Sequence, residues 1–99
     1  MFNKEKVMKG IRDNKEIIQR FGVKKIGLFG SFVRNGAKKR SDIDLLVEFK
    51  RNCETFDNYF ELKFFLEKLF KRKVDLVVKD TLKPRIKRDV LKDIEYARI

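Results

Sequence analysis

Residues 26–47 read IGLFGSFVRNGAKKRSDIDLLV, a stretch in which one apolar run stops at Gly30-Ser31 and another begins at Asp42-Ile43-Asp44. A glycine–serine turn at the end of a strand lets a phosphate approach free backbone N–H groups closely. Asp42 and Asp44 are two residues apart in an extended segment, so both carboxylates point to the same side of a sheet, which suits a divalent metal. The stretch therefore predicts a site for a metal-bound nucleotide.

Helices and strands are expected to alternate on both sides of this stretch, because apolar residues recur with helical spacing in some segments and alternate in others. A short helix or turn is expected from Ser31 to about Asn35. The other expected elements are a helix from about Asn3 to Phe21, a strand Val23–Phe29, a strand Ile43–Phe49, a helix Thr55–Phe70, a strand Lys73–Val78 and a helix from Pro84 to about Tyr96. The predicted order is αβαβαβα.

The topology follows from the requirement that the two halves of the site meet. Gly30-Ser31 lies at the end of the first strand and Asp42 at the start of the second, so those strands must be antiparallel. Asp75, near the start of the third strand, joins them only if that strand is parallel to the second and connected by a right-handed helical crossover. We therefore expect an α/β (α+β) fold, a small mixed three-stranded sheet with flanking helices, in a single domain of residues 1–99.

The three carboxylates each have a structural alternative. Asp42 could merely begin a strand, and Asp75 could form an ion pair with Lys73 or Arg72. Asp44 lies within an otherwise apolar run, where an unpaired carboxylate is costly unless a cation compensates its charge. The carboxylates together with the Gly-Ser turn favour a functional site.

The polar residues between the two halves also allow two interpretations. Ser31 could be a helix N-cap, and that role is compatible with binding a phosphate because both place the hydroxyl beside free N–H groups. Arg34 could reach either a phosphate or solvent. The Lys38-Lys39-Arg40 run is interpreted as a solvated loop behind the Asn35-Gly36 turn.

The composition excludes several classes of site. The chain has 99 residues, 42% of them hydrophobic and 41% charged, with a net charge of +11, one cysteine and no histidine. A zinc site, a histidine-based triad and an internal disulfide are therefore excluded. No apolar run approaches the roughly 18 residues of a membrane span, and a reducing, cytoplasmic location is expected. The positive charge favours an anionic nucleotide, a nucleic acid or an acidic protein as partner.

The residues above resemble the minimal nucleotidyltransferase (MNT) family of the DNA polymerase β-like nucleotidyltransferase superfamily. The family motif Gly-Ser-x10-Asp-x-Asp is met by Gly30, Ser31, Asp42 and Asp44. Three further segments are similar to family features, namely Thr55-Phe-Asp-Asn-Tyr59, Val74-Asp-Leu-Val77 and Leu82-Lys-Pro84. The family commonly has glycine directly after the arginine, whereas here Asn35 intervenes and the glycine is Gly36.

The resemblance implies an antitoxin enzyme that transfers AMP from ATP to a tyrosine of a partner HEPN-domain ribonuclease toxin and so neutralises it, releasing pyrophosphate. It implies that Asp42, Asp44 and Asp75 are catalytic and bind one or two Mg²⁺ ions, and that Gly30, Ser31 and Arg34 bind the nucleotide. Two alternatives remain. One is a module that neutralises its partner by occlusion without catalysis, and the other is an RNA-directed nucleotidyltransferase, suggested by the charge of +11.

Overall fold

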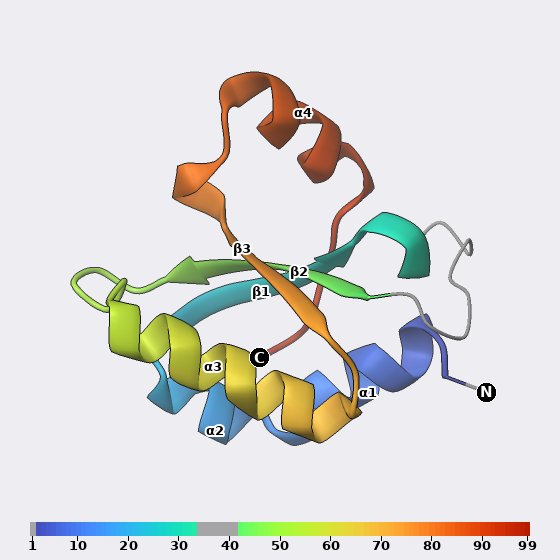
Figure 1. Ribbon diagram of the computed structural model, residues 1–99, viewed down its shortest axis with the longest axis vertical. Helices are drawn as coiled ribbons and strands as arrows, with labels where there is room; N and C mark the ends of the chain where they lie inside the picture. The colour runs from blue at the N-terminus through green and yellow to red at the C-terminus, as the bar shows by residue number, and fades with distance from the viewer. Residues whose placement is uncertain (1, 34–41) are drawn as a thin grey trace.

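A four-stranded mixed sheet forms the centre of the computed structural model, which describes residues 2–33 and 42–99 (Figure 1). Its strand order is β3–β2–β1–β4. β1 (Val23–Phe29) pairs with β2 (Ile43–Phe49) in the antiparallel sense, and β3 (Val74–Val78) pairs with β2 in the parallel sense. Both strand directions predicted from the sequence are confirmed.

The fourth strand, β4 (Glu95–Tyr96), corrects the expectation of three strands and of a last helix reaching Tyr96. The last helix, α4, spans Pro84–Asp93, and the chain is already extended at Ile94, with ψ of 140°. Two contacts favour the strand over another helical turn. The Ala97 amide donates to the Ile26 carbonyl at 2.9 Å, and Ile94 packs directly over Gly27, where any Cβ would lie 2.7 Å from its Cδ1.

The N-terminal helix is also shorter than expected, because it breaks at Asn14 into α1 (Lys4–Asp13) and α2 (Lys15–Arg20). The Asn14 side-chain amide donates to the Gly10 carbonyl at 2.7 Å, and its backbone leaves the helical region, with φ of −113° and ψ of 21°. Asparagine side chains compete in this way with the backbone hydrogen bonds of a helix. The apolar spacing that predicted one helix continues across the break.

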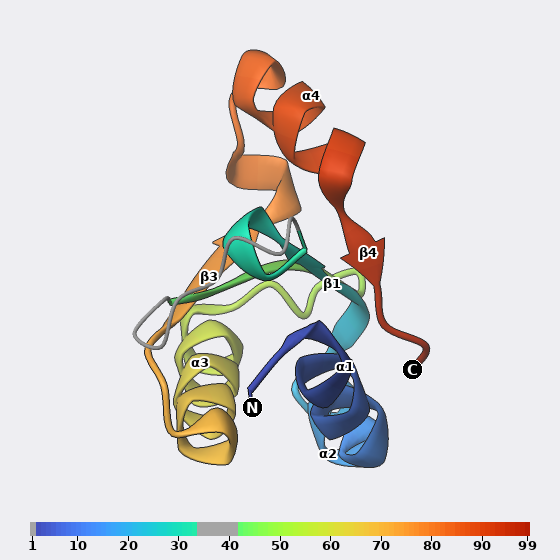
Figure 2. The ribbon, with the colours of Figure 1, turned by 90° about the vertical axis from the view of Figure 1, so that its right-hand side faces the viewer.

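The helices cover the two faces of the sheet unequally. α1, α2 and α3 (Phe56–Phe70) lie on one face and α4 lies on the other (Figure 2). Alternation along β2 directs Ile43, Leu45 and Val47 toward the three-helix face, where they are fully buried with residues of α1 and α3. Leu46, on the opposite face by the same alternation, is also buried.

Three chain segments consequently meet at one end of the sheet. The end of β1 lies beside the start of β2, with Phe29 opposite Asp44, and the start of β2 lies beside the start of β3. No helix among the described residues is both long and apolar enough to cross a membrane.

Candidate nucleotide site

Gly30 begins a single 3₁₀ turn, Gly30–Phe32, directly after β1. Its φ of +76° lies in the left-handed region that favours glycine. A Cβ at this position would collide with Oδ2 of Asp44, so the Asp44 carboxylate lies directly against the Gly30 backbone. The two halves of the sequence motif therefore meet in the structure, and this contact requires glycine for both backbone and steric reasons.

Asp44 and Asp75 are direct register partners on the parallel strands β2 and β3. Neighbouring strands lie about 4.8 Å apart and residues in register share a face, so both carboxylates are on the α4 side of the sheet. Asp42 is exposed just before β2, two residues from Asp44 and on the same side by alternation. The topology thus gathers the three predicted carboxylates at one sheet end.

The three carboxylates are neighbours without forming a closed metal cluster. Within residues 2–33 and 42–99, no group of three or more carboxylate or thiol side chains is arranged to hold an ion. The structural alternative for Asp75 finds no support in the described part of the chain, because Asp75 has no ion pair there. Arg72 instead stacks over the rings of Phe2 and Phe32, at 4.5 and 5.6 Å from their centroids.

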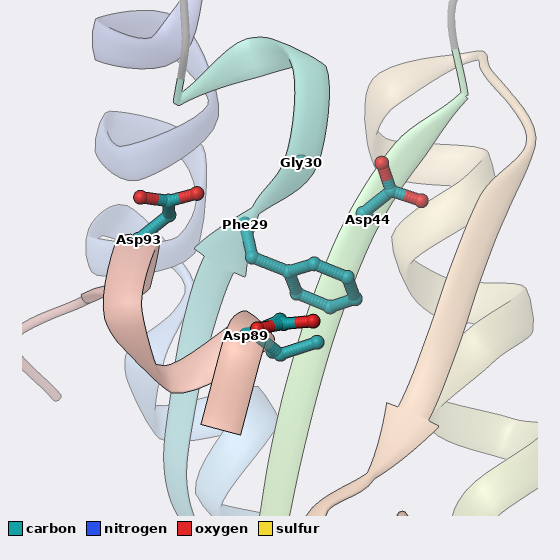
Figure 3. Close-up of a pocket in the computed structure, with 6 residues that line it drawn as sticks. Phe29, Gly30, Asp44, Asp89 and Asp93 are labelled. Carbon is teal, nitrogen blue, oxygen red and sulfur yellow. The ribbon is translucent and has the colours of Figure 1, made fainter. Parts of the chain in front are cut away.

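A pocket of about 210 Å³ opens between the Gly30 turn and α4 (Figure 3). Its lining residues are Phe29, Gly30, Asp44, Asp89, Val90 and Asp93. Asp89 and Asp93 are four residues apart on α4, so they share one helix face, and Figure 3 shows them on either side of the end of β1. α4 therefore forms one wall of the site.

Sequence reasoning missed Asp89 and Asp93 as site residues. The signal that could have found them is their spacing of four within a helix whose other charged residues, Arg85, Lys87, Arg88 and Lys92, are all basic. Their carboxylates accept hydrogen bonds and attract cations but repel phosphate oxygens. A nucleotide in this pocket would therefore turn hydroxyl or amino groups, rather than its phosphates, toward α4.

The anion-binding half of the site is only partly described. Ser31 lies inside the 3₁₀ turn and is partly buried, and the cap position of that turn is Phe29, so the helix N-cap interpretation of Ser31 is wrong. Arg34, the Asn35-Gly36 turn and the Lys38–Arg40 run lie outside the described residues. Their predicted roles stay predictions.

Comparison with known proteins agrees with this geometry. The family model described as nucleotidyltransferase domain matches residues 11–97. The protein adenylyltransferase MntA of Thermococcus cleftensis is 45% identical over 82 residues, which make up 83% of this chain and 82% of that protein. Both findings agree with the resemblance carried by the Gly-Ser and Asp-x-Asp motif.

Solved structures give the same result for the fold. A structure of a minimal nucleotidyltransferase superposes with a TM-score of 0.74 at 33% identity, covering 89% of this chain and 93% of that one. A crystal structure of a toxin–antitoxin pair with AMP-PNP superposes with a TM-score of 0.69 at 25% identity, covering 96% of this chain and 72% of that one. The expected nucleotidyltransferase fold is confirmed.

Proposed function

The chain belongs to the nucleotidyltransferase domain family, and on that premise we propose that it transfers AMP from ATP to a tyrosine hydroxyl of a HEPN-domain toxin and thereby acts as the antitoxin. The names of two relatives support this proposal. The Thermococcus relative is a protein adenylyltransferase, and one similar structure is a toxin–antitoxin pair with an ATP analogue. We further propose that the reaction takes place in the cytoplasm.

The observation that carries the proposal is the contact between Gly30 and Asp44, with Asp75 in register beside them. A phosphate bound at the Gly30-Ser31 turn would lie next to carboxylate oxygens, which are the ligand type that Mg²⁺ prefers, so the chemistry of the donors suits this ion. We assign Asp42, Asp44 and Asp75 as the residues that would hold one or two Mg²⁺ ions. Such an ion would neutralise charge on the triphosphate and polarise the phosphorus–oxygen bonds of the transferred group.

The chain's own residues position the reactants. The backbone N–H groups and hydroxyl of the Gly30-Ser31 turn bind the β- and γ-phosphates, and Arg34 adds a cationic contact. The acceptor tyrosine oxygen forms a bond to the α-phosphorus while the bond from that phosphorus to the bridging oxygen of pyrophosphate breaks. The tyrosine proton passes to Asp75, which is exposed and can therefore be reached by an acceptor from another molecule. Orientation of the hydroxyl beside the phosphorus accounts for much of the rate.

The position of the phosphate label distinguishes nucleotidyl transfer from other reactions of ATP. We expect the purified HEPN protein to gain radioactivity from ATP labelled at the α-phosphate and none from ATP labelled at the γ-phosphate. Asp42→Asn with Asp44→Asn should reduce this labelling by at least about a hundredfold, as expected for losing transition-state electrostatic stabilisation. Labelling from the γ-phosphate would indicate a kinase, and equal labelling by the double variant would mean that the site is misplaced.

A further inference from the structure

An aromatic stripe runs along the outer side of α3. Phe56, Phe60 and Phe64 are spaced by four residues, so they follow one another along the helix surface. The side chains of Phe56 and Phe64 are 76% and 63% exposed, and Phe60 is partly buried between them. The ring centroids are 4.4 Å apart for Phe56 and Phe60 and 6.1 Å for Phe60 and Phe64. Contiguous exposed apolar surface of this kind marks interaction sites.

The fold itself does not require the two exposed rings. α3 is anchored to the sheet by Leu62, Leu66 and Phe70 on its inner face, all of them buried. Phe56 and Phe64 belong neither to the buried core nor to the partly buried hydrophobic residues that pack against it. Their exposure leaves an unfavourable apolar surface that a partner would remove from water.

The neighbouring edge of the sheet indicates how a partner would bind. Along the outer edge of β3, the Val74 amide donates to Glu67 Oε2 at 2.9 Å, and the Leu76 carbonyl accepts from the Tyr59 hydroxyl at 2.5 Å. The Val78 carbonyl accepts from the Thr81 hydroxyl at 2.8 Å. These side chains occupy the groups that an added strand would need, so docking at this side must use the α3 side chains instead.

The charges select between two kinds of occupant. Asp57 and Glu61 flank the N-terminal half of the stripe. Lys63 and Lys68 flank the C-terminal half, where the Glu67 carboxylate accepts the hydrogen bond of the Val74 amide. A second copy of the chain would bring together two molecules that each carry +11, and the repulsion opposes a contact centred on only three rings. An acidic protein would instead be attracted by the net charge of the whole molecule, and its carboxylates would lie best near Lys63 and Lys68. The apolar face of a helix, packed along α3, fits the convex stripe.

We propose that the Phe56–Phe60–Phe64 stripe is the docking surface for the protein acceptor, which packs an acidic amphipathic helix along α3 with its carboxylates near Lys63 and Lys68. This inference rests on the proposed function, because it identifies the partner with the molecule that receives AMP. The stripe holds the acceptor, and the site at Gly30 and Asp44 carries out the transfer.

The test uses the double variant Phe56→Ser with Phe64→Ser and a purified HEPN-domain protein. Ile17→Ser on α2 is the matched control, because Ile17 is another exposed large apolar side chain, at 38% exposure, outside the stripe. Both variants should melt like the wild type. We expect the double variant to bind the HEPN protein at least about tenfold more weakly, as measured by calorimetry without ATP. It should also raise KM for the acceptor by a similar factor, leaving kcat and ATP binding unchanged, whereas Ile17→Ser changes none of these.

Several outcomes would overturn the inference, and they differ from failure of the proposed function. Unchanged acceptor binding in the double variant would show that the stripe is not the docking surface. The same conclusion follows if the substitution dissociates a wild-type dimer in sedimentation and leaves acceptor binding intact, since the occupant is then a second copy. Wild-type protein that binds the acceptor through the stripe without labelling it would contradict the proposed function alone. Failure of the wild type to bind the acceptor would overturn both the inference and the proposed function.

Discussion

Gly30 joins the two halves of the site at the scale of a single residue. Its φ of +76° and the Asp44 carboxylate beside it both exclude a side chain. We expect Gly30→Ala to lower the free energy of unfolding by about 1–2 kcal/mol from backbone strain alone, and to displace the Asp44 carboxylate. The rate of AMP transfer per folded molecule should therefore fall sharply, as measured by acceptor labelling alongside urea denaturation.

Gly22→Ala is the matched control for this substitution. Gly22 has φ of +82°, and a Cβ there would collide with Cys53, far from the three carboxylates along the chain and at the opposite end of β1. It should cost comparable stability with an unchanged rate per folded molecule. Equal losses of activity in the two variants would show that the Gly30 effect is one of stability rather than of site geometry.

The second prediction at this scale concerns Asp44. A ligand that binds only the folded state raises stability by RT ln(1 + [L]/Kd), about 2.7 kcal/mol at a hundredfold excess over Kd. Mg²⁺ with ATP should therefore raise the melting temperature of the wild type, and Asp44→Asn should largely abolish the metal-dependent part of that rise. Equal shifts in both proteins would contradict the assignment of Asp44 to the metal site.

The sequence predicted the residues of the motif but not the opposite wall of the pocket. The interval between Gly30-Ser31 and Asp42 identified the first group, because the motif is local and each residue type has a clear chemical reason to be there. Asp89 and Asp93 reach the pocket only because α4 packs back over the end of β1. That packing depends on contacts between residues far apart in the chain, which no local pattern encodes.

At the scale of elements, the central strands were predictable and the ends of the helices were not. β1 and β2 have the predicted bounds, and their directions followed from the need to bring Asp44 to Gly30. β4 has only two residues and is defined by its pairing with β1. Its own sequence continues the apolar spacing of the preceding helix, so the local pattern predicted more helix there instead of a strand. The break at Asn14 depends on one side-chain hydrogen bond to Gly10, which competes with helical spacing that continues on both sides.

Tyr59 links α3 to β3 and gives a prediction that depends on pH. Its hydroxyl donates to the Leu76 carbonyl, and burial raises its pKa above the usual value of 10.0, with the Asp75 carboxylate adding to the rise. Tyr59→Phe should cost about 1 kcal/mol of stability at pH 8, because one hydrogen bond is lost.

This contribution should vanish at high pH. Above pH 10 the unfolded state loses the tyrosine proton before the folded state does, so the stabilisation is complete below the unfolded pKa and is lost as pH rises through the folded one. Urea denaturation at pH 8 and at about pH 11 measures the difference in free energy of unfolding between the wild type and Tyr59→Phe. Both proteins contain the same lysines, so the effect of lysine titration cancels in this difference. A difference that stays constant between the two pH values would contradict this account of Tyr59.

For the whole molecule, the net charge of +11 and the small pocket agree with the proposal that a macromolecular partner supplies the acceptor. The positive field attracts both a nucleoside triphosphate and an acidic protein, and it is weakened by salt. A preference for acidic partners stays a prediction from this charge. The sequence could not distinguish a protein from RNA, because net charge carries no information on the shape of the partner.

The most direct test of the central claim is the intact mass of the purified HEPN protein after incubation with the wild-type chain, ATP and Mg²⁺. We predict a gain of one or more adenylyl groups, mapped to tyrosine by peptide fragmentation, and no gain with the Asp42→Asn, Asp44→Asn double variant. A HEPN protein that is inhibited but unmodified would contradict the claim and indicate neutralisation by occlusion. Extension of an RNA 3′ end, with the HEPN protein unmodified, would contradict it in favour of an RNA-directed enzyme.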